Sequence, residues 1–114
     1  MIEDFFKIGA NLKKIPRKGW QTKVGIDNPE SVADHSFSMA LISMIISDIE
    51  GYDTNKIMKM SLIHDLAESV VGDFTPEEIS ASEKASLENK AMNDILNKLP
   101  ESLKNEYFDI WKEY

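Results

Sequence analysis

The residues best suited to chemistry are the two histidines of the chain, each of which has an acidic neighbour. His35 follows Asp34, whereas His64 is followed directly by Asp65 and, one helical turn later, by Glu68. Because residues three and four apart share one face of a helix, the second group is expected to form a compact polar stripe. Imidazole nitrogens combined with carboxylate oxygens favour zinc, manganese, iron or cobalt, whereas all-oxygen sites suit calcium or magnesium.

Spacing alone leaves two interpretations of these residues open. In the first, His35, His64 and Asp65 meet across a helix pair and hold a divalent ion, which would offset the cost of burying the carboxylate. In the second, His64 is a core histidine whose hydrogen bonds are satisfied and Asp65 is an ion-pair partner, as for most single histidines on helices. The presence of the whole histidine inventory and two acids on one helix pair favours the metal site.

The elements that must position these residues are helices, because apolar residues recur at helical spacing and no alternating strand pattern is present. The expected helices span 2–14, 32–50, 54–70, a short segment that starts at Thr75–Glu78, 81–98, and the residues after Pro100. The helices 32–50 and 54–70 carry apolar residues on most sides, which predicts that they form the buried pair of the domain. The predicted fold class is an all-α bundle of five or six helices.

The boundaries of the central helices are predicted from their capping residues. Ser31 or Asp34 can accept a hydrogen bond from the first turn of one helix, and Asp53 or Thr54 can do the same for the next. Gly51 is expected to end the first of them in a left-handed conformation. Residues 15–31 are predicted to be a long irregular connection before the first of these helices, a kind of loop that often carries function.

Composition restricts the class of protein. With 114 residues the chain suits a single domain, residues 1–114, and the absence of cysteine fits a reducing compartment. The formal net charge of −7 would repel a nucleic-acid polymer over most of the surface. The longest apolar run, residues 40–46, is much shorter than the roughly 20 residues that cross a bilayer. We therefore expect a cytoplasmic protein with no membrane segment.

Four segments, in this order along the chain, are similar to one known family of enzymes. They are Leu12–Trp20, Pro29–Phe37, Leu62–Glu68 and Val71–Pro76. They resemble the HD superfamily of metal-dependent phosphohydrolases, whose mark is a histidine, a His-Asp pair and a distant aspartate. The resemblance is closer to the 5′-deoxynucleotidase family of HD-domain proteins, and it extends to the last residues of the chain.

The resemblance implies an HD-domain helical bundle that removes phosphate from deoxyribonucleoside 5′-monophosphates with a divalent metal, which is Co, Mn, Zn, Fe or Mg. It also assigns a role to each matching residue of the motifs. These are His35, His64 and Asp65 as metal ligands, Glu68 and Asp73 in catalysis, and Arg17 and Trp20 in nucleotide binding.

The chemical properties of these side chains suit the roles that the resemblance implies. Glu68 is suited to positioning or deprotonating a water molecule, and Asp73 to orienting the nucleophile or serving the leaving alkoxide. Arg17 offers a planar donor fork that matches phosphate oxygens, and Trp20 can pack on the sugar or base. From the residues alone, the alternatives are a helix cap for Asp73, a surface charge for Arg17 and a core-edge aromatic for Trp20.

The chain departs from the family pattern at its end. The last metal ligand of the family is an aspartate on a later helix, beyond the position of Tyr114, and Asp109 and Glu113 belong to the preceding helix. We therefore expect either a C-terminally truncated fragment or a natural short form with an incomplete site. The aromatic stripe of Tyr107, Trp111 and Tyr114 favours a fragment or a surface that a partner covers.

The sequence is compatible with three functions. The first is hydrolysis of nucleoside monophosphates, and the second is hydrolysis of another phosphorylated nucleotide, such as a triphosphate or a cyclic phosphodiester. The third is a non-catalytic helical module that binds a partner through the aromatic stripe. The resemblance and this stripe also lead us to expect a homodimer.

Overall fold

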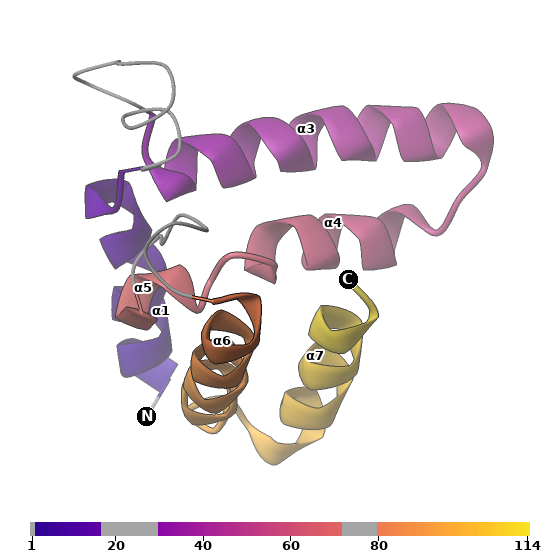
Figure 1. Cartoon of the computed structure of the whole chain (residues 1–114). Coiled ribbons are helices and arrows are strands. Elements are labelled where there is room, and N and C mark those ends of the chain that lie inside the picture. The colour runs from indigo at the N-terminus through magenta and orange to yellow at the C-terminus, as the bar shows by residue number, and fades with distance from the viewer. Residues whose placement is uncertain (1, 17–29, 72–79) are drawn as a thin grey trace.

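The computed structural model describes residues 2–16, 30–71 and 80–114, in which every regular element is a helix (Figure 1). The elements are α1 (Ile2–Asn11), a 3-10 turn η1 (Leu12–Lys14), α3 (Val32–Glu50), α4 (Thr54–Ile63), α5 (Glu68–Val71), α6 (Ala81–Leu96) and α7 (Glu101–Glu113). The predicted all-α bundle of five or six helices is confirmed. The helix start expected at Thr75–Glu78 lies outside the described residues.

The caps of the central helices lie where the sequence predicts them. The Ser31 hydroxyl accepts from the backbone N–H of Asp34 at 3.1 Å, and the Asp34 carboxylate accepts from the backbone N–H of Ser31 at 3.2 Å. This reciprocal pair is a capping box, which stabilises the first turn of α3. At the other end Gly51 has φ 76°, the left-handed conformation that favours glycine. Asp53 caps α4 by accepting from the N–H of Lys56 at 3.2 Å.

A short backbone pairing closes the connection between η1 and α3. The N–H of Val32 donates to the carbonyl of Ile15 at 2.8 Å, and Pro16 and Ser31 form an isolated antiparallel bridge. Pro16 and Ser31 therefore lie next to each other, and η1 is held against the start of α3.

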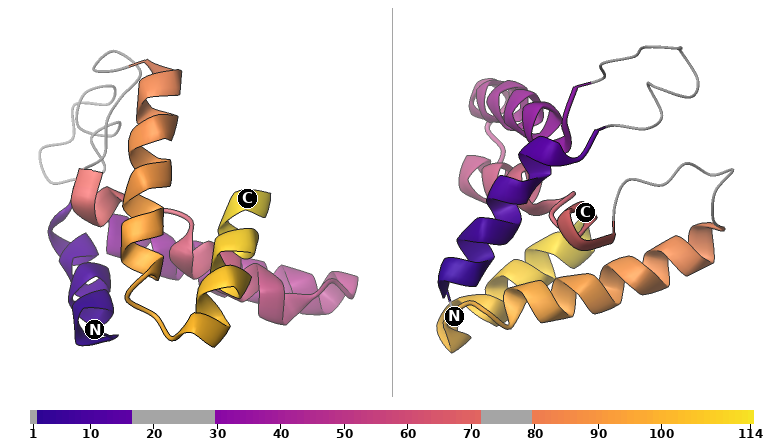
Figure 2. Two further views of the ribbon diagram at one scale, coloured as in Figure 1. Left: turned by 90° about the horizontal axis from the view of Figure 1, so that it is seen from below. Right: turned by 90° about the vertical axis from the view of Figure 1, so that its left-hand side faces the viewer.

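The core lies on the inward side of α6. Met92, Ile95 and Leu96 are at most 1% exposed, and Ile110 of α7 and Leu12 of η1 pack into the same cluster. Figure 2 shows α6 crossing the bundle with α1 on one side and α7 on the other. Burying each such side chain contributes roughly 1.5–3 kcal/mol to the free energy of folding, so α6 supplies a large part of the stability of the domain.

The predicted continuous helix over 54–70 is wrong, because α4 ends at Ile63 and turns separate it from α5. The cause is a side chain that competes with the backbone. The Nδ1 atom of His64 lies 2.6 Å from the carbonyl of Ser61, which in a continuing helix would accept from the N–H of Asp65. The backbone instead forms tighter turns, in which the N–H of Glu68 donates to the carbonyl of Asp65 at 3.0 Å.

The prediction that 32–50 and 54–70 form a buried pair is wrong for α3. Phe37 is 67% exposed, Ile42 59% and Ile49 74%, because α3 lies at the edge of the bundle and packs on α4 and η1 along one narrow side (Figure 1). Small residues such as Ala40 and Ser47 occupy the buried side. By length and composition alone α3 would also suit a membrane span, a test that core helices pass as well.

Candidate metal centre

The structure brings the three predicted metal ligands together. His35 lies in the first turns of α3, whereas His64 and Asp65 lie in the turn that follows α4. One ligand atom from each lies within 4.8 Å of the others. The two imidazole rings have centroids 5.6 Å apart and an interplanar angle of 64°, so a single ion can contact both rings after small side-chain rotations.

The hydrogen bond of His64 determines which of its nitrogen atoms is available. A carbonyl only accepts hydrogen bonds, so the contact with Ser61 at 2.6 Å places the ring proton on Nδ1. The Nε2 atom then faces Oδ2 of Asp65 at 2.9 Å. A neutral imidazole nitrogen and a carboxylate oxygen both donate electron pairs, so a positive species must lie with them, either a proton or a metal ion. This arrangement, in which a carbonyl orients the histidine, is typical of metal ligands.

The remaining side of the cluster is accessible to solvent. The side chains of His35 and Asp65 are 29% and 23% exposed, and their Nε2 and Oδ2 atoms lie 3.9 Å apart. His64 is buried at 5% exposure, so the cluster is closed to solvent on the side of His64 and open on the side of His35 and Asp65. Two imidazoles and one carboxylate fit a divalent metal, and three protein ligands leave coordination positions open for water or substrate.

Glu68 lies one turn beyond the cluster, as predicted, although this turn is not part of a continuous helix. It is the first residue of α5 and is 6% exposed. α5 is tied to α1 because the hydroxyl of Ser69 donates to the carbonyl of Ile8 at 2.7 Å. The catalytic role of Glu68 stays a prediction. Asp73, Arg17 and Trp20 lie outside the described residues, and their roles also stay predictions.

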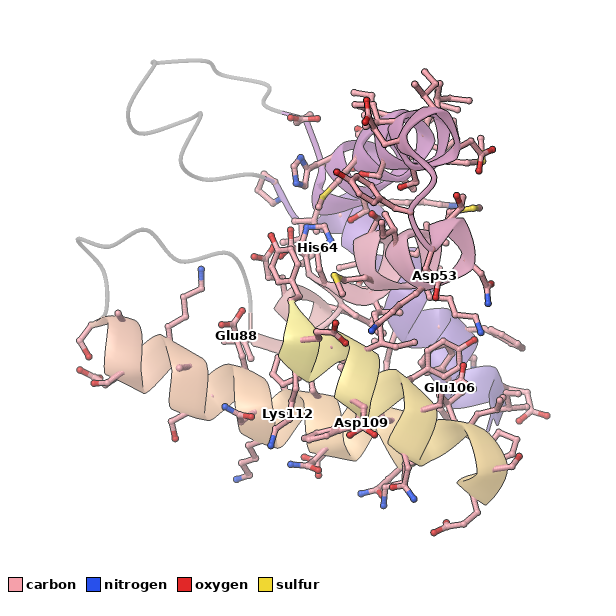
Figure 3. The ribbon with its side chains drawn as sticks, turned by 90° about the vertical axis from the view of Figure 1, so that its right-hand side faces the viewer. Asp53, His64, Glu88, Glu106, Asp109 and Lys112 are labelled. Carbon is pink, nitrogen blue, oxygen red and sulfur yellow. The ribbon has the colours of Figure 1, made fainter. Side chains whose placement is uncertain are left out.

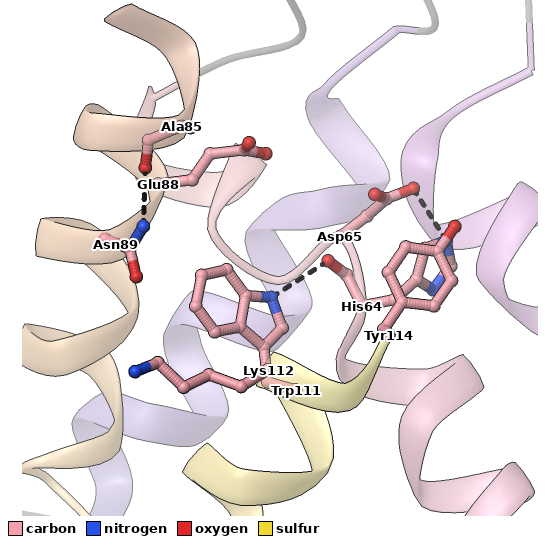
Figure 4. Close-up of a pocket in the computed structure, with 8 residues that line it drawn as sticks. All are labelled: His64, Asp65, Ala85, Glu88, Asn89, Trp111, Lys112 and Tyr114. Carbon is pink, nitrogen blue, oxygen red and sulfur yellow. Dashed lines mark hydrogen bonds and ion pairs between the residues drawn. The ribbon is translucent and has the colours of Figure 1, made fainter. Parts of the chain in front are cut away.

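A cavity of about 440 Å³ adjoins the cluster, which is within the size range of small-molecule sites (Figure 4). Its lining comes from the turn after α4, from α6 and from the end of α7: His64, Asp65, Ala85, Glu88, Asn89, Trp111, Lys112 and Tyr114. Glu88, Asn89 and Lys112 were not predicted from the sequence. They belong to the polar faces of their helices. The sequence pattern predicts that a polar face is exposed to solvent, and only tertiary packing shows that it borders a site.

The aromatic stripe of the last helix packs largely against the molecule. Tyr107 and Trp111 are half-buried and contact the core, and the indole Nε1 of Trp111 donates to the carbonyl of His64 at 3.3 Å. Tyr114 is 64% exposed, and its ring centroid lies 5.0 Å from that of His64. Figure 3 shows His64 beside this end of α7. The stripe expected to bind a partner is therefore mainly an internal contact.

Comparison with known proteins identifies relatives over nearly the whole chain. A protein-family model described as "HD domain" matches residues 9–114. The 5′-deoxynucleotidase HDDC2 of Dictyostelium discoideum is 44% identical over 97% of this chain and 62% of its own length. The human protein of the same name is 38% identical over 96% of this chain and 53% of its own length.

A solved structure agrees with these relatives. A conserved hypothetical protein from Pyrococcus furiosus superposes with a TM-score of 0.77 at 34% identity, covering 97% of this chain and 64% of that protein. The chain thus spans between about half and two thirds of the length of the relatives it matches. The matched region includes the histidine of α3 and the His-Asp pair after α4. The chain therefore belongs to the HD-domain family.

Proposed function

We propose that this chain hydrolyses the 5′-phosphate ester of deoxyribonucleoside monophosphates with the help of a divalent metal ion. The observation that carries the proposal is the convergence of His35, His64 and Asp65, from two segments about thirty residues apart, within 4.8 Å of one another. The 5′-deoxynucleotidases of Dictyostelium and human, which are 44% and 38% identical to the chain, support the substrate class.

The reaction consumes one water molecule and breaks one phosphorus–oxygen bond. The water oxygen adds to phosphorus as the bond to the 5′ oxygen breaks, and one proton passes from the water to the departing alkoxide. A divalent ion supplies Lewis acidity to the phosphoryl group and makes water more acidic. The chain supplies ligands of fixed orientation, since the carbonyl of Ser61 holds His64 with Nε2 turned toward the cluster.

The remaining roles follow the family resemblance. Glu68 is assigned to accepting the proton of water, and its buried position one turn from Asp65 supports that assignment. Asp73 is assigned to the leaving alkoxide, and Arg17 and Trp20 to the phosphate and the nucleoside. Each of these three assignments is tested by its own alanine variant, which should lower phosphate release without removing bound metal.

The decisive experiment measures phosphate release from deoxyribonucleoside monophosphates by purified protein loaded in turn with Co, Mn, Zn, Fe or Mg. Activity should require metal and should be lost in His64→Ala. Asp109→Asn is the matched control, because Asp109 is an exposed acid on α7 that takes no part in the cluster, and it should keep full activity. Metal-loaded wild-type protein that releases no phosphate would overturn the proposal.

A panel of nucleotides tests the choice of substrate. Monophosphates should be hydrolysed faster than triphosphates or cyclic phosphodiesters, and deoxyribose and ribose forms should be compared for each base. Faster hydrolysis of a triphosphate or a cyclic phosphodiester would assign the chain to a different reaction of the HD superfamily.

The proposal includes a cytoplasmic homodimer. The absence of cysteine supports a reducing compartment, and the exposed apolar side of α3, with Phe37, Ile42 and Ile49, supports association of two copies. Light scattering should give twice the monomer mass, and Ile49→Lys should lower it. A wild-type monomer at high concentration would remove the dimer from the proposal.

A further inference from the structure

The turn that carries His64 and Asp65 follows directly after the end of α4. The last backbone carbonyls of a helix have no hydrogen-bond donor within the helix. In this turn two such carbonyls have side-chain donors. The carbonyl of Ser61 accepts from Nδ1 of His64, and the carbonyl of His64 accepts from Nε1 of Trp111. The first donor belongs to the turn itself, whereas the second comes from α7, forty-seven residues later in the sequence.

We propose that Trp111 is a positioning residue for the metal centre, a role that rests on the proposed metal-dependent function. Its indole N–H, 3.3 Å from the carbonyl of His64, fixes the backbone of that residue and so the direction of its imidazole (Figure 4). Asp65 shares the peptide group whose carbonyl is held, so the same bond also restrains the carboxylate ligand.

The donor can act in this way because α7 is also anchored by contacts with α4 that do not involve the turn. Ile110, the residue before Trp111, is buried at 7% exposure. Two ion pairs join α7 to α4: Lys56 with Glu113 at 2.6 Å, and Lys59 with Glu106 at 2.9 Å. The turn is thus held between α4, from which it emerges, and α7, whose position other contacts determine.

The alternative is that Trp111 is only a core-edge aromatic and that its hydrogen bond is incidental. The two explanations differ in what the N–H group contributes. If only the packing of the Trp111 ring matters, Trp111→Phe should lower stability but keep the metal affinity, as loss of a neighbouring ring would. If the N–H positions the ligands, the variant should bind metal more weakly than its stability loss accounts for, since hydrogen bonds that orient ligands are worth about tenfold or more in affinity.

The test compares Trp111→Phe with Phe108→Leu, which removes a neighbouring half-buried ring of α7, 5.9 Å from Trp111, that has no hydrogen-bonding group. Co²⁺ is titrated into each protein, and its visible absorption reports both affinity and ligand geometry. We expect Trp111→Phe to bind Co²⁺ about tenfold more weakly with altered band intensities. Phe108→Leu should lose stability but keep wild-type affinity and spectrum.

A wild-type affinity and spectrum in Trp111→Phe would overturn the proposal, and so would a wild-type protein that binds no Co²⁺. If Trp111→Phe does not fold, the wild-type protein still provides a test by ¹⁵N NMR. The indole signal of Trp111, assigned by its persistence in Trp20→Phe, should shift when Zn²⁺ is added, and an unchanged signal would overturn the proposal. Because these readouts are binding and spectra, metal binding without phosphate release would overturn the proposed hydrolysis and leave the role of Trp111 standing.

Discussion

An ion in the cluster would join side chains of two segments, α3 and the turn after α4, that lie about thirty residues apart in the sequence. His35 lies on α3, a helix with much of its surface exposed, and His64 and Asp65 lie on the turn after α4. Metal binding should therefore stabilise the folded state. At a free metal concentration of a hundred times Kd the gain is about 2.7 kcal/mol, or a rise in Tm of about 10 °C for a domain of this size.

The test of this linkage is His35→Ala, with Asp34→Ala as its matched control. His35→Ala leaves two ligands on one turn, and if affinity falls about a hundredfold the same metal concentration stabilises by only about 0.4 kcal/mol. Asp34 is exposed and belongs to the capping box, so Asp34→Ala should lower stability by roughly 1 kcal/mol yet keep the full metal-induced gain.

Thermal unfolding with chelator and with each metal measures these gains directly. The quantity compared is the difference between the two midpoints for each protein, so a change in the stability of the metal-free state cancels. An undiminished metal-induced rise in His35→Ala would refute the reasoning, because it would show that the ion does not join α3 to the turn.

Three further predictions concern stability. Ser31→Ala removes the hydroxyl that caps α3 and should cost about 1 kcal/mol in denaturant unfolding, with no loss indicating that the cap is not used. Met92→Ala, at a position 0% exposed, should cost about 2–5 kcal/mol, whereas Leu62→Ala, at a position 51% exposed, should change stability by less than about 0.5 kcal/mol. The hydrogen bond to Glu106 raises the pKa of Lys59 above its ordinary 10.5, so the stabilisation lost in Lys59→Met should be constant from neutral pH up to that value and disappear as pH rises through the raised pKa. A difference that vanishes near neutral pH would contradict this assignment.

The sequence predicted those features that depend on local chemistry. The boundaries at Ser31, Gly51 and Asp53 follow from side chains and backbone conformations within one turn of the residue concerned, and the structure confirms all three. The chemistry of His35 and the His-Asp pair favoured a shared metal site and the family resemblance named these residues as ligands, and the structure brings the three side chains together.

The features that the sequence did not predict depend on tertiary packing. Apolar periodicity indicates which faces of α3 are apolar, but it does not indicate whether another element covers them. Glu88, Asn89 and Lys112 border the cavity only because α6 and α7 pack on either side of the turn. For Trp111, the aromatic stripe suggested an exposed surface, whereas the structure assigns its N–H to a carbonyl far away in sequence.

Two consecutive residues, His64 and Asp65, both face the cluster at the point where α4 ends. Neighbouring side chains project about 100° apart around a helix axis, and His64 keeps helical backbone angles, φ −57° and ψ −36°, so the contact between this pair depends on their side-chain rotamers. In the turn, Nε2 of one lies 2.9 Å from Oδ2 of the other. The hydrogen bond that ends the helix, from Nδ1 of His64 to the carbonyl of Ser61, is also the bond that leaves Nε2 for the ion. The same hydrogen bond therefore lies at the end of the helix and gives the imidazole of His64 the orientation of a ligand.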